Sequence, residues 1–449
     1  MKFRYPIVTA ALGASVLAHH AAAQARPKFT TLYNFTGGSD GAWPGGALVA
    51  GQNGALYGTA QGGGSNPTVQ CNPFGGPPGC GTVFQLTPGE EGAPWTLAVI
   101  HSFAGYPGDG GAPEGGLTTN ETGAFYGTTM VGGDVSCPGI FGGCGAVFEL
   151  TPPAEPGAPW TETVIHNMTD WGYHPETSLA AGRDGVLYGT GAAGTGGWLL
   201  FGLEPPPSPG GAWTFKVLVY LLPDAPAGLA VSRQASDNAV IYGAGAGFDG
   251  AAGSVFEAAR MAPGERWTVG NLYSFTGQNG DGTFPVAALI VTASGALYGT
   301  TNHGGYDNPL CTALPIGWTG CGTVFELVPS PGGAWTESVL YSFTGQNGDG
   351  ALPMAGLVEG QDGALYGTTA AGGSGPCFFN SLQGCGTVFK LTPPAVTGGA
   401  WTEAVLHSFV GTDGAQPSST LLLEKNGVLY GTAYNAGAVG YGTVFELTP

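Results

Sequence analysis

The sequence predicts an all-β protein, a seven-bladed β-propeller of four-stranded antiparallel blades. Two observations carry this prediction. A segment related to Leu-Tyr-Gly-Thr recurs seven times, and the last repeat lacks a strand that the N-terminal region supplies. The tyrosines of the repeated segment are Tyr57, Tyr126, Tyr188, Tyr242, Tyr298, Tyr366 and Tyr430. Self-similarity at a spacing of about 60 residues is typical of propellers and other repeat architectures.

Each repeat contains four short runs with the composition of β-strands. In the sixth repeat these runs cover residues 357–359, 364–369, 386–391 and 401–409. They are rich in β-branched and aromatic residues, they alternate between apolar and polar positions, and Asp-Gly, Asn-Gly or Pro turns separate them. Because no 3.6-residue periodicity follows the first 25 residues, we expect four antiparallel strands per repeat and almost no helix.

The two ends of the chain indicate that the repeats close into a ring. The final repeat stops after its third strand, at residues 442–449, and residues 29–35 resemble the fourth strand at 335–343. Lending the first strand to the last blade joins the ends and removes unpaired strand edges. An open β-solenoid does not need this offset start, so the closed ring is the preferred interpretation.

The N-terminal 25 residues have the pattern of a signal peptide. A basic start with Lys2 and Arg4 precedes an apolar stretch at 7–17 and a small-residue cleavage site at 23–25. Residues 26–449 then form one domain, in which the 85 glycines of 449 residues serve turns rather than disorder. The expected blade units are 37–103, 104–168, 169–222, 223–275, 276–343, 344–409, and 410–449 together with 26–36.

The eight cysteines occur as four pairs that indicate disulfides. In every pair the second cysteine directly precedes the third strand, and three repeats lack both members. The expected bridges are Cys71–Cys80, Cys137–Cys144, Cys311–Cys321 and Cys377–Cys385. The alternative, a zinc site, is disfavoured because the pairs lack metal-ligand spacing. Disulfides and the leader together predict a secreted or periplasmic protein.

Charge limits the possible partners. The chain carries 30 acidic residues against 11 basic ones, and its formal net charge is −19. Nucleic acid is excluded as a partner because phosphate binding needs Lys and Arg. No later apolar stretch is long enough to span a membrane. We expect a monomer that binds an unidentified protein or glycan.

At this point the chain resembles a known family. The succession Leu-Tyr-Ser-Phe, Gly-Asp-Gly, Leu-Tyr-Gly-Thr-Thr, Gly-Thr-Val-Phe-Glu-Leu and Trp-Thr-Glu is similar to the tandem repeat of the choice-of-anchor GloVer proteins, named for Gloeobacter and Verrucomicrobia. The best matches lie at 340–350, 365–373 and 322–329, and the third and fourth repeats are the most eroded. The resemblance implies an exported or surface protein and brings no catalytic residues to this chain.

Loops on one face carry the candidate binding residues. The loop from strand two to strand three and the loop from strand four to the next strand one share a face, and each repeat has an aspartate in the second of these loops. The seven aspartates are Asp40, Asp109, Asp170, Asp224, Asp281, Asp349 and Asp413. Carboxylates in such loops form turns with backbone N–H groups, and a ring of them is also a candidate for Ca²⁺ binding.

Aromatic and histidine side chains complete the candidates. Three tryptophans outside the repeat pattern, Trp43, Trp171 and Trp318, are placed on the aspartate face, where they either stack on a sugar or cover blade edges. His101, His166 and His407 occupy the repeat position that Tyr33, Tyr273 and Tyr341 hold, so we interpret them as strand residues.

Two functions remain open. The first is a non-catalytic binding or scaffold propeller with an acidic loop face and an unknown ligand. The second is a secreted polysaccharide hydrolase or lyase that uses loop carboxylates, which predicts an acidic pocket formed by residues that break the repeat pattern.

Overall fold

The structure is a computed structural model of the 449-residue chain. The residues that it describes are 26–66, 71, 76–120, 123–133, 142–155, 157–169, 174–175, 177–194, 196–208, 210–222, 224–232, 239–247, 250–260, 262, 264–306, 308, 310–311, 317–379, 382–396 and 398–449. The predicted signal peptide at 1–25 lies outside these residues.

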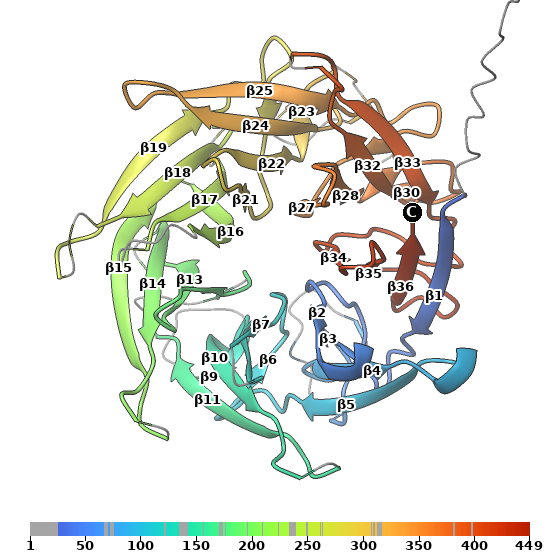
Figure 1. Ribbon diagram of the computed structural model, residues 1–449. Coiled ribbons are helices and arrows are strands. Elements are labelled where there is room, and N and C mark those ends of the chain that lie inside the picture. The colour runs from blue at the N-terminus through green and yellow to red at the C-terminus, as the bar shows by residue number, and fades with distance from the viewer. Residues whose placement is uncertain are drawn as a thin grey trace, which may run out of the picture.

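Seven four-stranded antiparallel sheets surround a central axis and confirm the predicted propeller (Figure 1). In each of the first six blades the strands follow the chain outward from the inner to the outer strand, and the inner strand has only two residues in every one of them except blade 4. Helical turns among the described residues are limited to η1 (Gln52–Gly54) and η2 (Glu90–Gly92).

The first four blades begin after the N-terminal strand. Blade 1 contains β2 (Val49–Ala50), β3 (Leu56–Ala60), β4 (Thr82–Thr87) and β5 (Thr96–Ser102). Blade 2 contains β7 (Thr118–Thr119), β8 (Phe125–Thr129), β10 (Gly143–Thr151) and β11 (Thr161–Asn167). Blade 3 contains β12 (Ala180–Ala181), β13 (Leu187–Ala192), β14 (Trp198–Glu204) and β15 (Thr214–Leu222). Blade 4 contains β16 (Ala225–Val231), β17 (Ile241–Ala246), β18 (Ser254–Ala259) and β19 (Thr268–Ser274).

The last three blades complete the ring. Blade 5 contains β21 (Ile290–Val291), β22 (Leu297–Thr301), β24 (Thr323–Pro329) and β25 (Trp335–Ser342). Blade 6 contains β27 (Val358–Glu359), β28 (Leu365–Thr369), β32 (Thr387–Thr392) and β33 (Thr402–Ser408). Blade 7 contains β34 (Leu422–Leu423), β35 (Leu429–Ala433), β36 (Thr443–Thr448) and β1 (Lys28–Asn34).

Closure by the N-terminal strand is seen directly in blade 7. Strand β1 pairs antiparallel with β36, from Lys28 opposite Thr448 to Asn34 opposite Thr443. Figure 1 shows β1, in blue, as the outer neighbour of the red strand β36. The outer edge of β36 is therefore paired, and the two ends of the chain hold one blade together.

Repeated aromatic residues pack one blade against the next. The phenylalanine that follows the outer strand touches the third-strand phenylalanine of the following blade, with ring centroids 5.1–5.3 Å apart. These pairs are Phe35–Phe84, Phe103–Phe148, Phe275–Phe325, Phe343–Phe389 and Phe409–Phe445. Edge-to-face contacts of this kind add about 0.5–1.5 kcal/mol each beyond the burial of apolar area.

The repeated Leu-Tyr-Gly-Thr segment serves the same packing. Its tyrosine meets the outer-strand tryptophan of the following blade, and the contact between Tyr430 and Trp95, 6.0 Å between centroids, spans the closure of the ring. Its glycine lies beneath the third-strand phenylalanine. A Cβ atom on Gly58 would stand 2.6 Å from the Phe84 ring, so the repeat requires glycine at this position.

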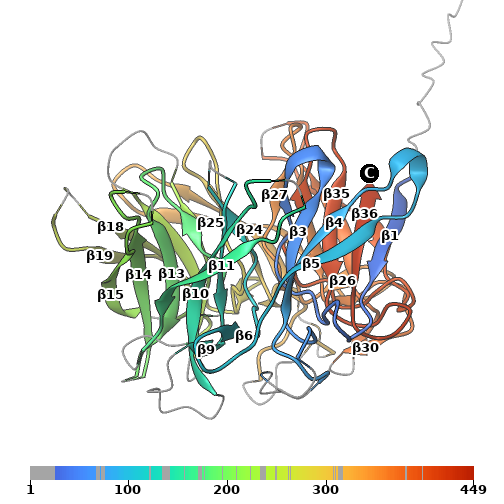
Figure 2. The same cartoon turned by 90° about the horizontal axis from the view of Figure 1, so that it is seen from below.

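The loops after strands two and four meet on one face of the ring, as predicted. Short strands from these loops pair at three blades, in β6 (Gly110–Gly111) with β9 (Val131–Gly133), β20 (Gly282–Thr283) with β23 (His303–Gly304), and β26 (Gly350–Ala351) with β29 (Ala371–Gly372). A further hairpin joins β30 (Phe378–Phe379) to β31 (Leu382–Gln383). Figure 2 shows β6, β9 and β30 at the lower edge of the ring. We call this side the loop face.

Three of the predicted disulfides are present on the loop face. They join Cys71 to Cys80, Cys311 to Cys321 and Cys377 to Cys385. The fourth predicted bridge involves Cys137, which lies outside the described residues.

Within the described part of the chain, no helix has the length and apolar character that crossing a membrane requires.

Candidate functional site

Five loop-face aspartates hold the turn that follows the outer strand. Each carboxylate accepts a hydrogen bond, at 2.6–2.8 Å, from the backbone N–H of the residue directly after the phenylalanine that follows the outer strand. These aspartates are Asp40, Asp109, Asp281, Asp349 and Asp413. This geometry agrees with the interpretation that these carboxylates hold turns through backbone N–H groups. Ligand or Ca²⁺ binding at this ring stays a prediction.

Asp224 differs from these five aspartates. Asp224 is buried and accepts a hydrogen bond from the Ser254 hydroxyl at 2.5 Å, so it joins the start of β16 to β18 of the same blade. Asp170 lies outside the described residues. The seven aspartates are thus not one set of equivalent groups.

Two of the three off-pattern tryptophans lie among the described residues. Trp43 is half-buried and stacks on Tyr434, with ring centroids 6.0 Å apart. Trp318 is half-buried and packs on the hydrophobic core between blades 4 and 5. Trp171 lies outside the described residues. Both described side chains pack on other residues of the protein, and covering of blade edges and contact with a ligand both stay predictions.

A cavity of about 360 Å³ opens on the loop face where blades 1, 2, 6 and 7 approach the axis. We call it the mouth pocket. Its wall combines amide, hydroxyl and carboxylate groups with apolar side chains. The lining residues are Gly45, Gln61, Glu114, Met354, Ala370, Phe379, Gln416, Ser418 and Tyr434. Glu114 is the one carboxylate among these lining residues.

A chain of hydrogen bonds crosses three blades at the mouth pocket. The Tyr434 hydroxyl donates to Oε1 of Gln61 at 2.5 Å, and Nε2 of Gln61 donates to Oε1 of Glu114. Burial raises the pKa of Tyr434 to about 12, and the charge of Glu114 adds to this shift. The hydroxyl therefore stays protonated at neutral pH and acts as a hydrogen-bond donor.

Two residues of this pocket lie at a repeat position whose side chain varies along the sequence. Gln61 and Tyr434 occupy the same repeat position, directly after the second strand, where other repeats have Asn302 or Ala370. The residues vary while the surrounding Gly and Thr residues recur. Such a departure from the pattern marks these two positions, but only the structure shows that they meet across the ring closure.

A second arrangement recurs between the outer strands of neighbouring blades, and we call it the blade joint. At the joint of blades 4 and 5, the Tyr273 hydroxyl donates to Asp281, and Glu337 of β25 faces both groups. Burial raises the pKa of Glu337 to about 7, helped by the charge of Asp281. Tyr341, Asp349 and Glu403 repeat this joint between blades 5 and 6, where burial and Asp349 raise the pKa of Glu403 to about 7.

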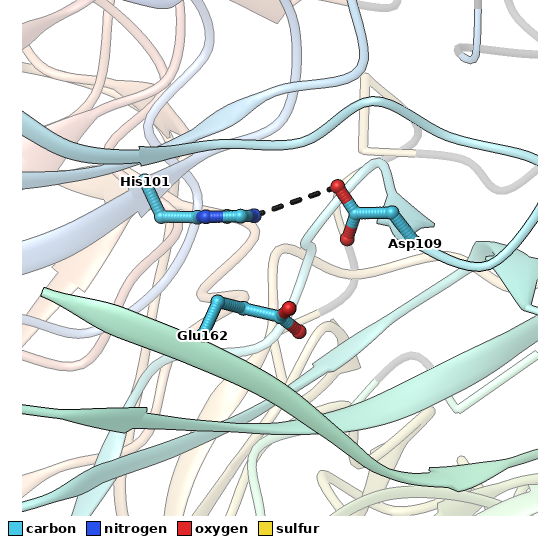
Figure 3. A group of neighbouring side chains, drawn as sticks. All are labelled: His101, Asp109 and Glu162. Carbon is cyan, nitrogen blue, oxygen red and sulfur yellow. Dashed lines mark ion pairs between the residues drawn. The ribbon is translucent and has the colours of Figure 1, made fainter.

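At the joint of blades 1 and 2, histidine replaces the tyrosine. His101 of β5, Asp109 of the following loop and Glu162 of β11 bring three ligand-type atoms within 4.8 Å of one another (Figure 3). Nε2 of His101 lies 3.6 Å from Oδ2 of Asp109. Burial raises the pKa of Glu162 to about 7, and the charge of Asp109 contributes to the rise. Among the described residues, these three are the group of His, Cys, Asp and Glu side chains that fits a metal ion.

Other joints lack the acidic partner. Nε2 of His407 lies 2.8 Å from Oδ2 of Asp413, but Phe29 holds the place of the glutamate and stacks on the imidazole at 3.7 Å between centroids. His166 stacks on Phe215 in a similar way, at 4.1 Å. The three histidines lie in outer strands, as we interpreted them. That interpretation did not predict the cluster at His101. The repeat alone does not show which residues of neighbouring blades face each other.

The protein is therefore a closed propeller built from sequence repeats, with acidic and disulfide-bonded loops on one face. The profile of the Gloeobacter/Verrucomicrobia repeat matches residues 20–197 and 310–449, more than two thirds of the chain. The chain belongs to the Gloeobacter/Verrucomicrobia repeat family, as its motifs predicted. The unmatched residues include the fourth blade, where the sequence showed the repeat to be eroded.

Comparison with other proteins adds likenesses of fold. An ulvan lyase of polysaccharide lyase family PL25 has 10% identity and a TM-score of 0.46, with 90% of this chain and 94% of that chain covered. The α-L-arabinanase of Penicillium chrysogenum has 11% identity and a TM-score of 0.40, with 90% and 92% covered. AofleA from Arthrobotrys oligospora, as a mutant, has 12% identity and a TM-score of 0.43, with 87% and 92% covered. Similarity at this level says nothing about activity. No curated protein sequence matches the chain significantly.

Proposed function

We propose that the protein is an exported, non-catalytic propeller that binds a neutral, hydroxyl-rich ligand such as an oligosaccharide in the mouth pocket. The observation that carries this proposal is the Tyr434–Gln61–Glu114 chain of hydrogen bonds at the pocket wall. Such side chains donate and accept hydrogen bonds with hydroxyl groups, while Phe379 and Met354 offer apolar surface to the carbon face of a sugar. The volume of about 360 Å³ falls in the range of small-molecule sites.

The composition of the pocket favours binding over hydrolysis. Glycoside hydrolysis ordinarily uses two carboxyl groups on either side of the scissile bond. The lining has one, Glu114, and it is hydrogen-bonded to Gln61. The raised pKa of Tyr434 makes this residue a poor base at neutral pH. A net charge of −19 also disfavours an anionic polysaccharide as the ligand.

The cysteines and the predicted leader support an exported protein. Three disulfides indicate an oxidising compartment outside the cytoplasm. With the predicted signal peptide, they support secretion or a periplasmic location for the binding protein.

A panel of neutral oligosaccharides tests the proposal. Mature protein is applied to a glycan array with and without Ca²⁺, and positive ligands are titrated by calorimetry. We expect Gln61→Ala and Tyr434→Phe to weaken binding at least tenfold. Asn302→Ala changes the equivalent repeat position in blade 5, outside the pocket lining, and we expect it to bind as the wild type does.

Three results would overturn the proposal. One is unchanged affinity in both pocket variants. Another is cleavage of any polysaccharide by the purified protein that is lost in Glu114→Gln, which would establish the hydrolase or lyase alternative. Binding that needs Ca²⁺ and is lost in Asp349→Asn would instead assign recognition to the aspartate loops.

A further inference from the structure

One repeat position of the outer strand decides the chemistry of each blade joint. Tyr273 and Tyr341 fill this position at two joints and His101 fills it at a third, with an aspartate and a glutamate placed alike around all of them. The tyrosine hydroxyl donates a hydrogen bond to the aspartate, while Oε1 of the glutamate at both joints is buried without a partner. The joint at His101 has the same backbone and the same two carboxylates but a different third group.

The imidazole does not replace the tyrosine hydrogen bond. Nε2 of His101 is 3.6 Å from Oδ2 of Asp109, which is too far for a hydrogen bond. Among the described residues, Nε2 of His101 and Oε1 of Glu162 are buried atoms that have no hydrogen-bond partner. The unpaired glutamate oxygen recurs at the tyrosine joints, so the unpaired imidazole nitrogen is what sets this joint apart. Buried polar atoms are nearly always paired, so this joint calls for a group that binds the imidazole nitrogen and the glutamate oxygen beside Asp109.

The surrounding contacts hold the three side chains in place. The backbone N–H groups of Ala104 and Gly110 donate to the two oxygens of Asp109, at 2.7 and 2.6 Å. The His101 ring packs edge-to-face on Phe103, 4.6 Å between centroids. Glu162 projects from β11 of the next blade toward both (Figure 3). Support of this kind orients the ligands of protein metal sites.

We propose that His101, Asp109 and Glu162 bind a divalent transition-metal ion of the zinc type, which ties β5 of blade 1 to β11 of blade 2. One imidazole nitrogen and two carboxylates are ligands that suit Zn²⁺, with a fourth position open to water. Ligand atoms within 4.8 Å of one another need only small side-chain movements to reach metal distances of about 2.0–2.2 Å. This site is separate from the Ca²⁺ prediction for the aspartate loops, because the imidazole nitrogen favours a transition metal over Ca²⁺.

The repeat supplies matched variants for the test. Tag-free mature protein is freed of metal with a chelator and titrated with Zn²⁺ by calorimetry, and its metal content is then measured. We expect one ion per chain. His101→Tyr installs the side chain that the other two joints already accommodate, so it should fold and lose at least about 100-fold in affinity, as Glu162→Gln should. His407→Tyr changes a histidine–aspartate pair without the glutamate, and we expect unchanged Zn²⁺ binding.

A second variant tests whether the same three ligands create a Zn²⁺ site at another joint. Tyr341→His places an imidazole between Asp349 and Glu403, and we expect it to add a second Zn²⁺ ion per chain. Zn²⁺ should raise the melting temperature of the wild type but not of His101→Tyr, since an ion that binds only the folded chain stabilises it. The proposal is overturned if the wild type takes up no Zn²⁺, or if His101→Tyr binds Zn²⁺ as the wild type does.

Discussion

Replacing the two joint glutamates by glutamine should change how the stability of the propeller depends on pH. Glu337 and Glu403 face Asp281 and Asp349, with Tyr273 and Tyr341 as the other titratable neighbours, and burial together with the aspartate raises each glutamate pKa from 4.5 to about 7. In the folded state each glutamate therefore binds a proton over a range of pH in which the unfolded chain has released it.

The sign of the effect follows from this proton uptake. A carboxyl group with a raised folded-state pKa contributes stability below about pH 4.5, and this contribution is lost as the pH rises to about 7. A shift from 4.5 to about 7 corresponds to at most about 3.4 kcal/mol per glutamate, at about 1.4 kcal/mol for each pH unit. Because both side chains are only half-buried, solvent screening reduces this figure, and we expect about 1 kcal/mol for each.

Denaturant unfolding at pH 5 and pH 8 measures the effect. Glutamine mimics the protonated group, so the free energy of unfolding of Glu337→Gln/Glu403→Gln, relative to the wild type, should rise by about 2 kcal/mol between pH 5 and pH 8. Burial lowers the pKa of His303 to about 4, so this histidine makes the folded state more stable as the pH rises. Its contribution is the same in variant and wild type and drops out of the difference between them. Glu265→Gln, at an exposed loop position, is the control.

Two results would refute the reasoning. One is a difference between variant and wild type that stays constant from pH 5 to pH 8. The other is a variant that loses stability toward pH 8, which would mean that the ionised glutamates make favourable contacts in the folded state.

Two further predictions concern the ring itself. Deleting residues 26–36 removes β1 and leaves β36 with an open edge, so the truncated protein should lose its cooperative unfolding transition and associate, as size-exclusion chromatography and calorimetry would show; a wild-type melting temperature would contradict the role of β1. Replacing both Cys311 and Cys321 by serine opens a disulfide with a sequence separation of 10 and should lower the free energy of unfolding by about 2–3 kcal/mol in chemical denaturation, whereas no loss would show that the loop is held by other contacts.

The architecture was predictable because the repeat encodes it several times. Seven tyrosine segments and the offset ends indicated the number of blades and the closure, and both are confirmed. The third and fourth repeats had lost much of the pattern, yet they form four-stranded blades like the others. Strand patterning within a blade depends on local sequence, which is why erosion of the motif did not hide it.

The sites were much less predictable, because they depend on contacts between blades. The sequence placed the aspartates on one face but did not show that Glu162 of one blade faces His101 and Asp109 of the blade before it. It also did not show that Tyr434 reaches Gln61 across the closure of the ring. Both contacts depend on how outer strands and loops of neighbouring blades align, and no local pattern reports that alignment.

The backbone explains why such variation is tolerated on the loop face. The residue before the repeated proline adopts a left-handed conformation, with φ between 52° and 60° in five repeats. In each of these its N–H donates to the preceding blade and its C=O accepts from its own blade. The residues are Trp43, Ala112, Phe284, Leu352 and Gln416. These bonds hold a conformation that costs about 1–3 kcal/mol, and they involve only main-chain atoms.

A side chain at that position is therefore not needed to hold the blades together, and it differs in every repeat. Gln61 and Tyr434 also vary at positions whose neighbours recur in the other repeats. Likewise, His101 takes the place of a tyrosine in a joint whose other residues are repeated. In this ring the recurring residues form the scaffold. The positions where the pattern changes, rather than the aspartates that recur in every repeat, are the ones to examine first for binding.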